Sequence, residues 1–285
     1  MKLLHHHYGK SRIRLIKVIR DGEVHSVTEL EVAVLLEGNF DSSYTTGDNQ
    51  MVIATDSMKN TIYALAKEHL GQEPERFGLV LAKHFLHRYS QVSRAEVQIM
   101  ESLWSRLRLD GKPHPHSFSR AGEMTPFTDV TCAGDQTKIE SGIQDLVILK
   151  STASGFSGFY KDEYTTLAET SERILASNLK ARWLFRDVPA NFRLANQNIV
   201  QAILKTFAEN YSPSVQRTLY EMGQSALRAV SSISEIHLSM PNLHCLLVNL
   251  APFGLQNNNE VFVPTQEPHG LIEASVSRGN GRNDE

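Results

Sequence analysis

The chain has 285 residues, of which 41% are hydrophobic and 21% charged, a composition typical of a globular protein with one large domain or two of ordinary size. The formal net charge of -3 at pH 7 argues against a nucleic-acid-binding protein, because no excess of Lys and Arg is present to neutralise phosphates. Two cysteines are too few for a disulfide framework or a four-thiolate metal site, and they indicate a reducing compartment.

The first half of the chain is predicted to contain a strand hairpin, a pair of helices and two further strands. Alternating apolar residues indicate the strands, and apolar residues at helical spacing indicate the helices. In chain order the predicted elements are strands over residues 8–20 and 24–36, a helix over 56–69, a helix that opens at Pro74, a strand over 94–108 and a weaker strand over 116–123.

The second half repeats this order around an insertion. Its predicted elements are strands over 127–133 and 143–150, an insertion with a short helix (167–175) and a strand (180–185), helices over 192–209 and 214–230, and strands over 233–240 and 244–250. The repeat predicts an α+β fold of two tandem units, each an antiparallel four-stranded sheet with a helix pair on one face. We expect the units over residues 1–124 and 125–277, followed by a polar, disordered tail over 278–285.

The junction before the first predicted helix is a candidate anion site. A short apolar run, 51–54, ends at Thr55-Asp56-Ser57, which we interpret as capping residues. The first backbone N–H groups of a helix have no partner within the helix and lie at the positive end of its dipole, so main chain alone could bind a flat anion there. The alternative is an ordinary helix cap without a ligand.

The twelve histidines do not predict a metal site. His84 and His87 are spaced i, i+3 on a predicted helix, His114 and His116 flank a proline, and His5-His6-His7 reads as a flexible terminal cluster. None of them comes with a third or fourth ligand at suitable spacing, so we expect no metal.

Five segments along the chain carry a family pattern. They are Tyr8-Gly9-Lys10; Ile53-Ala54-Thr55-Asp56-Ser57 with Lys59-Asn60-Thr61; Ser154-Gly155-Phe156-Ser157-Gly158-Phe159 with Asp162-Glu163-Tyr164-Thr165-Thr166-Leu167; Ser214-Val215-Gln216; and Pro241-Asn242-Leu243-His244. Each is a weak signal alone. Together, in this order and spacing, they resemble the urate oxidase (uricase) family over nearly the whole chain.

The resemblance implies the tunnelling fold (T-fold), with two units per chain and a homotetramer around a central tunnel. It also implies an oxidoreductase without a cofactor, which converts urate, O2 and water to 5-hydroxyisourate and H2O2 at sites between subunits. Members from eukaryotes commonly end in a peroxisomal signal, whereas this chain ends in Arg-Asn-Asp-Glu. We see no signal peptide and no apolar run of membrane-spanning length, so we expect a bacterial, cytoplasmic protein without a nucleic-acid or membrane partner.

The family's site residues carry over to nine positions. Lys10, Thr55 and His244 match its catalytic relay, and Thr55, Asp56 (through its backbone), Phe156, Arg173, Val215, Gln216 and Asn242 match its ligand contacts. Urate is a flat anion at neutral pH, so its site needs an aromatic face, donors in the ring plane and positive potential. We expect Phe156 to offer the face, and Arg173 with Gln216 to pair with one edge of the ring.

The expected chemistry needs a base. Urate must lose a second proton before the electron-rich dianion can reduce O2 directly, which makes a metal or flavin unnecessary. A lysine has an ordinary pKa of about 10.4 and acts as a base near neutral pH only where its surroundings lower that value. We hypothesise that Lys10 is such a lysine, that its proton passes through Thr55 and water to His244, and that Asn242 holds O2 or water above the ring.

Each of these residues also has an ordinary interpretation. Taken alone, Lys10 reads as a solvated charge, Thr55 as a helix cap and Asn242 as a turn residue. Two other functions stay open: an enzyme of the same fold that acts on pterins, which would need a zinc site and an anchoring Glu, and an assembly that binds purines without oxidising them.

Overall fold

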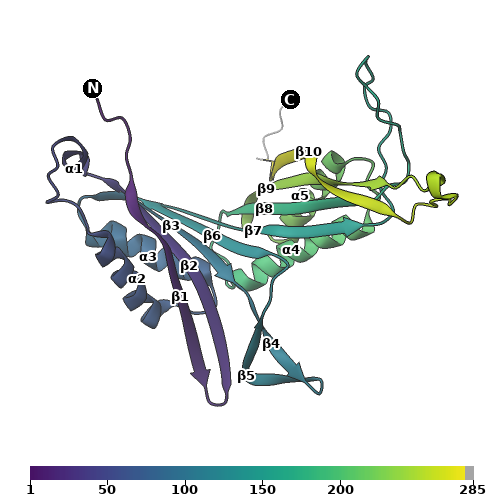
Figure 1. Cartoon of the computed structure of the whole chain (residues 1–285). Coiled ribbons are helices and arrows are strands. Elements are labelled where there is room, and N and C mark those ends of the chain that lie inside the picture. Colours follow the sequence, from purple (N-terminus) through teal and green to yellow (C-terminus); the bar gives the residue numbers. More distant parts are fainter. Residues whose placement is uncertain (280–285) are drawn as a thin grey trace. The chain divides into compact units, whose positions relative to one another are not determined.

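The chain forms two compact units (Figure 1). The computed structural model describes residues 1–279, apart from the side chain of Gln266. One unit consists of Met1–Gly142 with Leu184–Arg193, and the other of Ile143–Trp183 with Leu194–Glu285. The expected division into two T-fold units over 1–124 and 125–277 stays a prediction.

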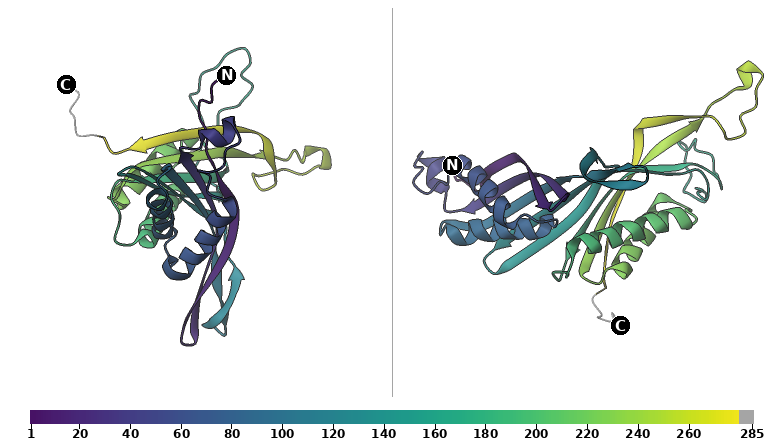
Figure 2. Two further views of the ribbon diagram at one scale, coloured as in Figure 1. Left: turned by 90° about the vertical axis from the view of Figure 1, so that its left-hand side faces the viewer. Right: turned by 90° about the horizontal axis from the view of Figure 1, so that it is seen from below.

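The first unit is built on an antiparallel sheet with helices on one face, as Figure 2 shows. Its elements are β1 (Tyr8–Asp21), β2 (Val24–Gly38), α1 (Asp41–Thr45), α2 (Thr55–His69), α3 (Pro74–Arg88), β3 (Val92–Ser102), β4 (Trp104–Leu109), β5 (Lys112–Arg120) and β6 (Thr125–Ala133). The strands pair in the order β1-β2-β3-β6, with α2 packed on β1 and α3 on β3 and β6. Fully buried side chains such as Phe77, Leu81 and Val97 form the core between them.

The two long helices of this unit were predicted correctly from the sequence, whereas two of its predicted strands differ from the observed ones. The helix predicted over 56–69 is observed within one residue, and Pro74 does open α3. The strand predicted over 94–108 is wrong, because β3 ends at Ser102 and β4 pairs with β5 in a separate two-stranded sheet. The apolar alternation runs on through this break and therefore does not mark it. The weak strand predicted over 116–123 belongs largely to β5, and the fourth strand of the sheet is β6.

The second unit has the same kind of architecture. It contains all or most of β7 (Gln136–Lys150), β8 (Leu175–Phe185), α4 (Phe192–Glu209), α5 (Val215–Ala229), β9 (Ile233–Leu247), the 3-10 turn η1 (Ala251–Phe253) and β10 (Phe262–Ser277). The first residues of β7 and α4 and the last of β8 belong to the first unit. β9 and β10 form a long antiparallel pair against which α5 packs. The two helices predicted over 192–209 and 214–230 are confirmed.

The short helix predicted over 167–175 is wrong. This segment has no helix, and the backbone of Thr170 instead pairs with that of Phe156 through hydrogen bonds of 2.7 and 3.0 Å. The hydroxyl of Thr170 also donates to the carbonyl of Glu172 at 2.6 Å. Such side-chain bonds to nearby backbone compete with helix formation.

The strands at the end of the second unit also differ from the prediction. Instead of two strands over 233–240 and 244–250, one strand, β9, continues through Pro241, which pairs with Leu271. The sequence pattern missed β10, because prolines such as Pro264 argue against a strand. A register shift between Thr265 and Gly270 accommodates this irregular stretch.

The tail predicted to be disordered begins too early by at least one residue. Arg278 donates from its backbone N–H to the carbonyl of Ser234 at 3.0 Å and from Nε to the carbonyl of Ile233 at 2.8 Å. The predicted tail from residue 280 onward lies outside the described residues.

Candidate active site

Lys10 lies on β1 next to a bulge. The preceding residue, Gly9, packs so closely on β2 that an added Cβ would lie 1.8 Å from the carbonyl O of Val34, so only glycine fits. After Lys10 the pairing with β2 is interrupted until Ile13, and Arg12 has a positive φ of 58°. Such a φ costs a non-glycine residue about 1–3 kcal/mol and is typical of functional sites. The regular strand predicted over 8–20 did not include this bulge.

The N-terminus of α2 has no side-chain cap. The N-cap residue is Ala54, which has no acceptor on its side chain. The first helical bond runs from the N–H of Met58 to the carbonyl of Ala54 at 3.1 Å, so the N–H groups of Thr55, Asp56 and Ser57 precede the helical ladder. The interpretation of Thr55 as a capping residue is therefore wrong. Thr55 is the first residue of the helix, and the positive end of the dipole stays available to a ligand.

Neighbouring cations offset the charge of the Asp56 carboxylate. The carboxylate accepts hydrogen bonds from Lys59 Nζ at 2.5 Å and from Asn60 Nδ2 at 2.9 Å. The bond from Lys59 and its charge lower the pKa of Asp56, and the positive charge of Lys10 lowers it further. Lys10 thus acts electrostatically on the same helix end.

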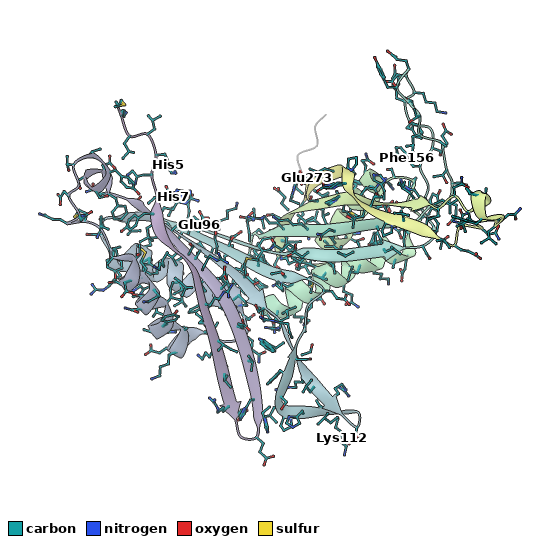
Figure 3. All side chains as sticks on the ribbon, viewed as in Figure 1. His5, His7, Glu96, Lys112, Phe156 and Glu273 are labelled. Carbon is teal, nitrogen blue, oxygen red and sulfur yellow. The ribbon has the colours of Figure 1, made fainter. Side chains whose placement is uncertain are left out.

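Phe156 and Arg173 come together in the loop between β7 and β8. Phe156 is labelled in Figure 3. The backbone N–H of Arg173 donates to the carbonyl of Ser154 at 2.8 Å. Arg173 Cζ lies 5.4 Å from the centroid of the Phe156 ring, and Phe159 stacks on that ring with the centroids 4.9 Å apart. Burial lowers the pKa of Arg173, but a guanidinium remains a cation at neutral pH. A planar set of donors therefore lies over an aromatic ring.

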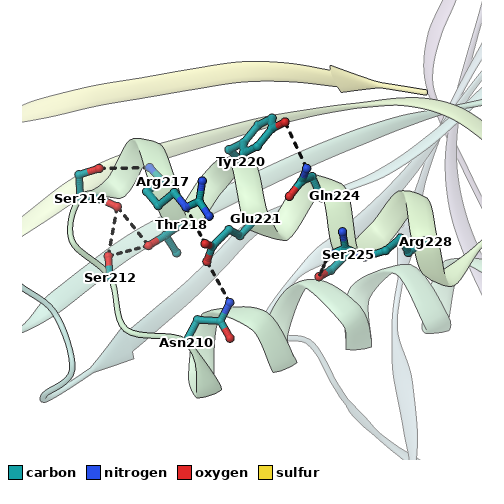
Figure 4. A network of polar contacts seen from close by, with 10 residues as sticks. All are labelled: Asn210, Ser212, Ser214, Arg217, Thr218, Tyr220, Glu221, Gln224, Ser225 and Arg228. Carbon is teal, nitrogen blue, oxygen red and sulfur yellow. Dashed lines mark hydrogen bonds and ion pairs between the residues drawn. The ribbon is translucent and has the colours of Figure 1, made fainter. Parts of the chain in front are cut away.

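α5 begins directly after a capping serine (Figure 4). Ser214 Oγ accepts a hydrogen bond from the N–H of Arg217 at 3.2 Å. The cap accepts from the third N–H group of the helix, that of Arg217. The N–H groups of Val215 and Gln216 come before it and are not used by this cap. The side chain of Val215 is buried, whereas that of Gln216 is exposed. This arrangement agrees with a role for Val215 through its backbone alone.

Backbone hydrogen bonds fasten the Phe156 loop to the segment before α5. The N–H of Gly155 donates to the carbonyl of Ser212 at 2.8 Å, and the N–H of Ser212 donates to the carbonyl of Ala153 at 2.9 Å. An added Cβ at Gly155 would lie 2.4 Å from Tyr211 Oη. Ser212 and Tyr211 were not predicted as site residues, and their position just before the capped helix start was the signal that could have indicated them.

Asn242 and His244 lie on β9 and, being two residues apart, on the same side of it. They pair with β10 at the two ends of its irregular stretch, Asn242 with Gly270 and His244 with Thr265. Thr265 Oγ1 also donates to the carbonyl of His244 at 3.3 Å. Asn242 is therefore a strand residue, and the alternative interpretation as a turn residue is wrong.

The nine predicted site residues fall into two sets. The first unit carries Lys10, Thr55 and Asp56, and the second carries Phe156, Arg173, Val215, Gln216, Asn242 and His244. Within residues 1–279, no group of three or more His, Cys, Asp or Glu side chains is placed to hold a metal ion. None of the described helices is long and apolar enough to cross a membrane.

Comparison with known proteins identifies the family. A family model described as Uricase matches residues 6–131 and 139–273. The chain belongs to the uricase family. It is 40% identical over 277 residues to the uricase of Arthrobacter globiformis, with 97% of this chain and 90% of that one covered. It is 42% identical over 287 residues to the uricase of Emericella nidulans, with 95% of each covered.

Solved uricase structures agree with this assignment. The crystal structure of the uricase from Arthrobacter globiformis has a TM-score of 0.94 and 39% sequence identity, with 100% of this chain and 98% of that one covered. The family, the α+β tunnelling fold and the urate oxidase function predicted from the five segments are confirmed. This uricase family member is an oxidoreductase that acts on urate.

Proposed function

We propose that this member of the uricase family oxidises urate with O2 and water, without a cofactor, through a proton relay of Lys10, Thr55 and His244. One observation carries the proposal: β1, the strand of Lys10, packs on α2, whose N-terminus has no side-chain cap, and Tyr8 of β1 bonds to Ile53 just before that N-terminus. The lysine supplies a base, and the free N–H groups supply a place for a flat anion.

Urate binding draws on both sets of site residues. Phe156 stacks on one face of the purine. Arg173 and Gln216 donate to its edge, with about 1.5–3 kcal/mol expected for a charge-assisted hydrogen bond. The backbone N–H groups at Thr55 with Asp56, and at Val215, hold the remaining acceptors, so two helix N-termini face one anion.

The reaction then balances without a metal or flavin. Lys10 accepts a proton from the urate monoanion, and Thr55 and water pass that proton to His244. The resulting dianion gives two electrons to O2, which leaves as H2O2 after taking up one proton from urate and one from solvent. Water then adds to the oxidised ring to give 5-hydroxyisourate. Asn242 holds O2, and afterwards water, above the ring.

The proposal includes the assembly and the compartment. We infer a homotetramer with active sites between subunits and a cytoplasmic location, on the strength of the family resemblance and of the two cysteines, which suit a reducing compartment.

The variant Lys10→Met tests the relay. We expect turnover to fall by about 100-fold to 10,000-fold, the range typical of a missing general base, with little change in urate affinity. Turnover is measured by the loss of urate absorbance in the ultraviolet together with O2 uptake, and affinity by urate titration in oxygen-free buffer.

A second lysine of β1 provides the control. Lys17 Nζ donates to the carbonyls of Ala66 and Lys67 at the end of α2, both at 2.8 Å, so Lys17→Met should lower stability and leave turnover near normal. Equal turnover in the Lys10→Met variant and the native protein would remove Lys10 from the mechanism. If the native protein binds urate but consumes neither urate nor O2, it is a purine-binding assembly instead.

A further inference from the structure

One tyrosine hydroxyl ties β1 to the segment that leads into α2. Tyr8 Oη accepts a hydrogen bond from the N–H of Ile53 at 2.8 Å and donates to the carbonyl of the same residue at 3.3 Å. Tyr8 lies two residues before Lys10, and Ile53 lies two residues before Thr55. The hydroxyl therefore connects the strand that carries the proposed base with the helix end that carries the proposed anion site.

The surroundings of Tyr8 keep this contact in place. The Tyr8 ring packs edge-on against the fully buried Phe40, with the centroids 4.8 Å apart, and Ile53 is buried as well. Burial raises the pKa of Tyr8, so its hydroxyl stays protonated and can donate and accept at the same time. Without the hydroxyl, the buried N–H and carbonyl of Ile53 would lose these partners, which is unfavourable enough to shift the segment.

The segment before α2 has little regular structure to hold it. Residues 46–54 contain neither helix nor strand. Two other side chains bond to its backbone: Gln91 Nε2 donates to the carbonyl of Met51 at 2.9 Å, and Ser42 Oγ donates to that of Asp48 at 3.3 Å. Of these anchors, Tyr8 is closest to the helix start and is the one that belongs to the strand of Lys10.

The strand side of the contact is held by β2. Tyr8, Gly9 and Lys10 all pair with β2, and Gly9 lies against its backbone. We therefore expect a change in the distance between Lys10 and Thr55 to come from the segment before α2, which Tyr8 holds.

We propose that Tyr8 is a positioning residue, which sets the distance between Lys10 and the N-terminus of α2 and so enables proton transfer from urate. The inference rests on the proposed function and deepens it, because it names what holds the base in place. Tyr8 itself takes no proton.

The test compares Tyr8→Phe with Tyr44→Phe. The first variant keeps the ring and removes both bonds to Ile53. The second removes another tyrosine hydroxyl from the same region, one that donates to the carbonyl of His7 at 3.2 Å and leaves the two bonds between Tyr8 and Ile53 in place. We expect Tyr8→Phe to lower kcat about 10-fold to 100-fold, as small misplacements of a reacting group do, and to change the dissociation constant for urate in oxygen-free buffer by less than about threefold. Tyr44→Phe should match the native protein in both.

The outcomes separate the two proposals. A native kcat in Tyr8→Phe overturns the positioning role, and so does an equal loss in both tyrosine variants. A weakened urate affinity with normal kcat also overturns it, because Tyr8 would then serve binding. Should the native protein fail to oxidise urate, the proposed function fails first.

A second variant keeps the test open if Tyr8→Phe does not fold. Gln91→Met releases another anchor of the segment, at Met51, without touching β1. We expect a smaller fall in kcat, about threefold, with urate affinity unchanged. A native kcat in that variant would then count against the inference.

Discussion

The ion pair between Asp56 and Lys59 lies at the helix end where urate is proposed to bind. Removing the cation by Lys59→Met leaves a carboxylate beside the anion, so we expect the dissociation constant for urate to rise about twofold to fivefold, with kcat nearly unchanged. Urate titration in oxygen-free buffer at low salt measures the effect, which should shrink as salt is added.

The matched control for this prediction is Lys67→Met, which removes an exposed lysine from the last turn of the same helix. A similar loss of affinity in both variants would mean that only the overall charge matters. The ion pair would then have no specific role.

At the same scale, the sequence could not predict the local geometry of the candidate site residues. Family motifs named Lys10 and Thr55, but apolar alternation cannot reveal the bulge after Lys10 or the positive φ of Arg12. The residue types of Thr55, Asp56 and Ser57 suggested a helix cap. The N-cap residue is instead Ala54, and the helix begins at Thr55, one residue before its predicted start. The contact between Tyr8 and Ile53 joins residues 45 apart and leaves no periodic trace in the sequence.

Among the elements, the loop between β7 and β8 depends on the close approach of Gly155 to Tyr211. A Cβ at this position would lie 2.4 Å from Tyr211 Oη and 2.9 Å from the carbonyl O of Thr170. We expect Gly155→Ala to lower stability by about 1–3 kcal/mol through overpacking and to weaken urate binding by displacing Phe156. Thermal unfolding and urate titration measure the two effects.

The double variant Gly155→Ala with Tyr211→Phe checks the cause. Tyr211→Phe removes the nearest clashing atom together with its hydrogen bond to the carbonyl of Ser171, which measures 3.1 Å. The double variant should recover part of the urate affinity lost in Gly155→Ala. No recovery would indicate that the backbone, rather than the tyrosine, resists the added methyl group.

The same elements show why part of the fold was predictable. Helices α2, α3, α4 and α5 bury one apolar stripe each, and that period is strong enough to be read from the chain alone. The short helix expected around Arg173 failed, because Thr170 and its neighbours use backbone and hydroxyl groups to hold the loop instead. β10 was not predicted, because the prolines in its sequence are more typical of loops than of strands.

At the scale of the whole molecule, the predicted site residues are divided between two units of the chain. If sites form between subunits, as proposed, two inactive variants can complement each other. Co-expression of Lys10→Met with Arg173→Met should restore up to about a quarter of the native activity, because some sites then combine an intact first unit with an intact second unit from another chain. Urate consumption by the mixed oligomer measures the recovery.

Each variant expressed alone serves as the control and should remain inactive. Complete absence of recovery in a verified mixed oligomer would show that one chain supplies both halves. The motifs of a single chain predicted both sets of site residues. They did not predict how chains combine, because that depends on surfaces outside the motifs.

The alanine at the start of α2 has a practical consequence. A serine at position 54 would cap the helix and is expected to increase the free energy of unfolding by about 0.5–2 kcal/mol. Its hydroxyl would, however, occupy an N–H group of the first turn that the proposed site offers to urate. We therefore expect Ala54→Ser to melt at a higher temperature and to bind urate less tightly. A screen for heat-resistant variants that does not also measure urate binding would therefore favour a less active protein at this position.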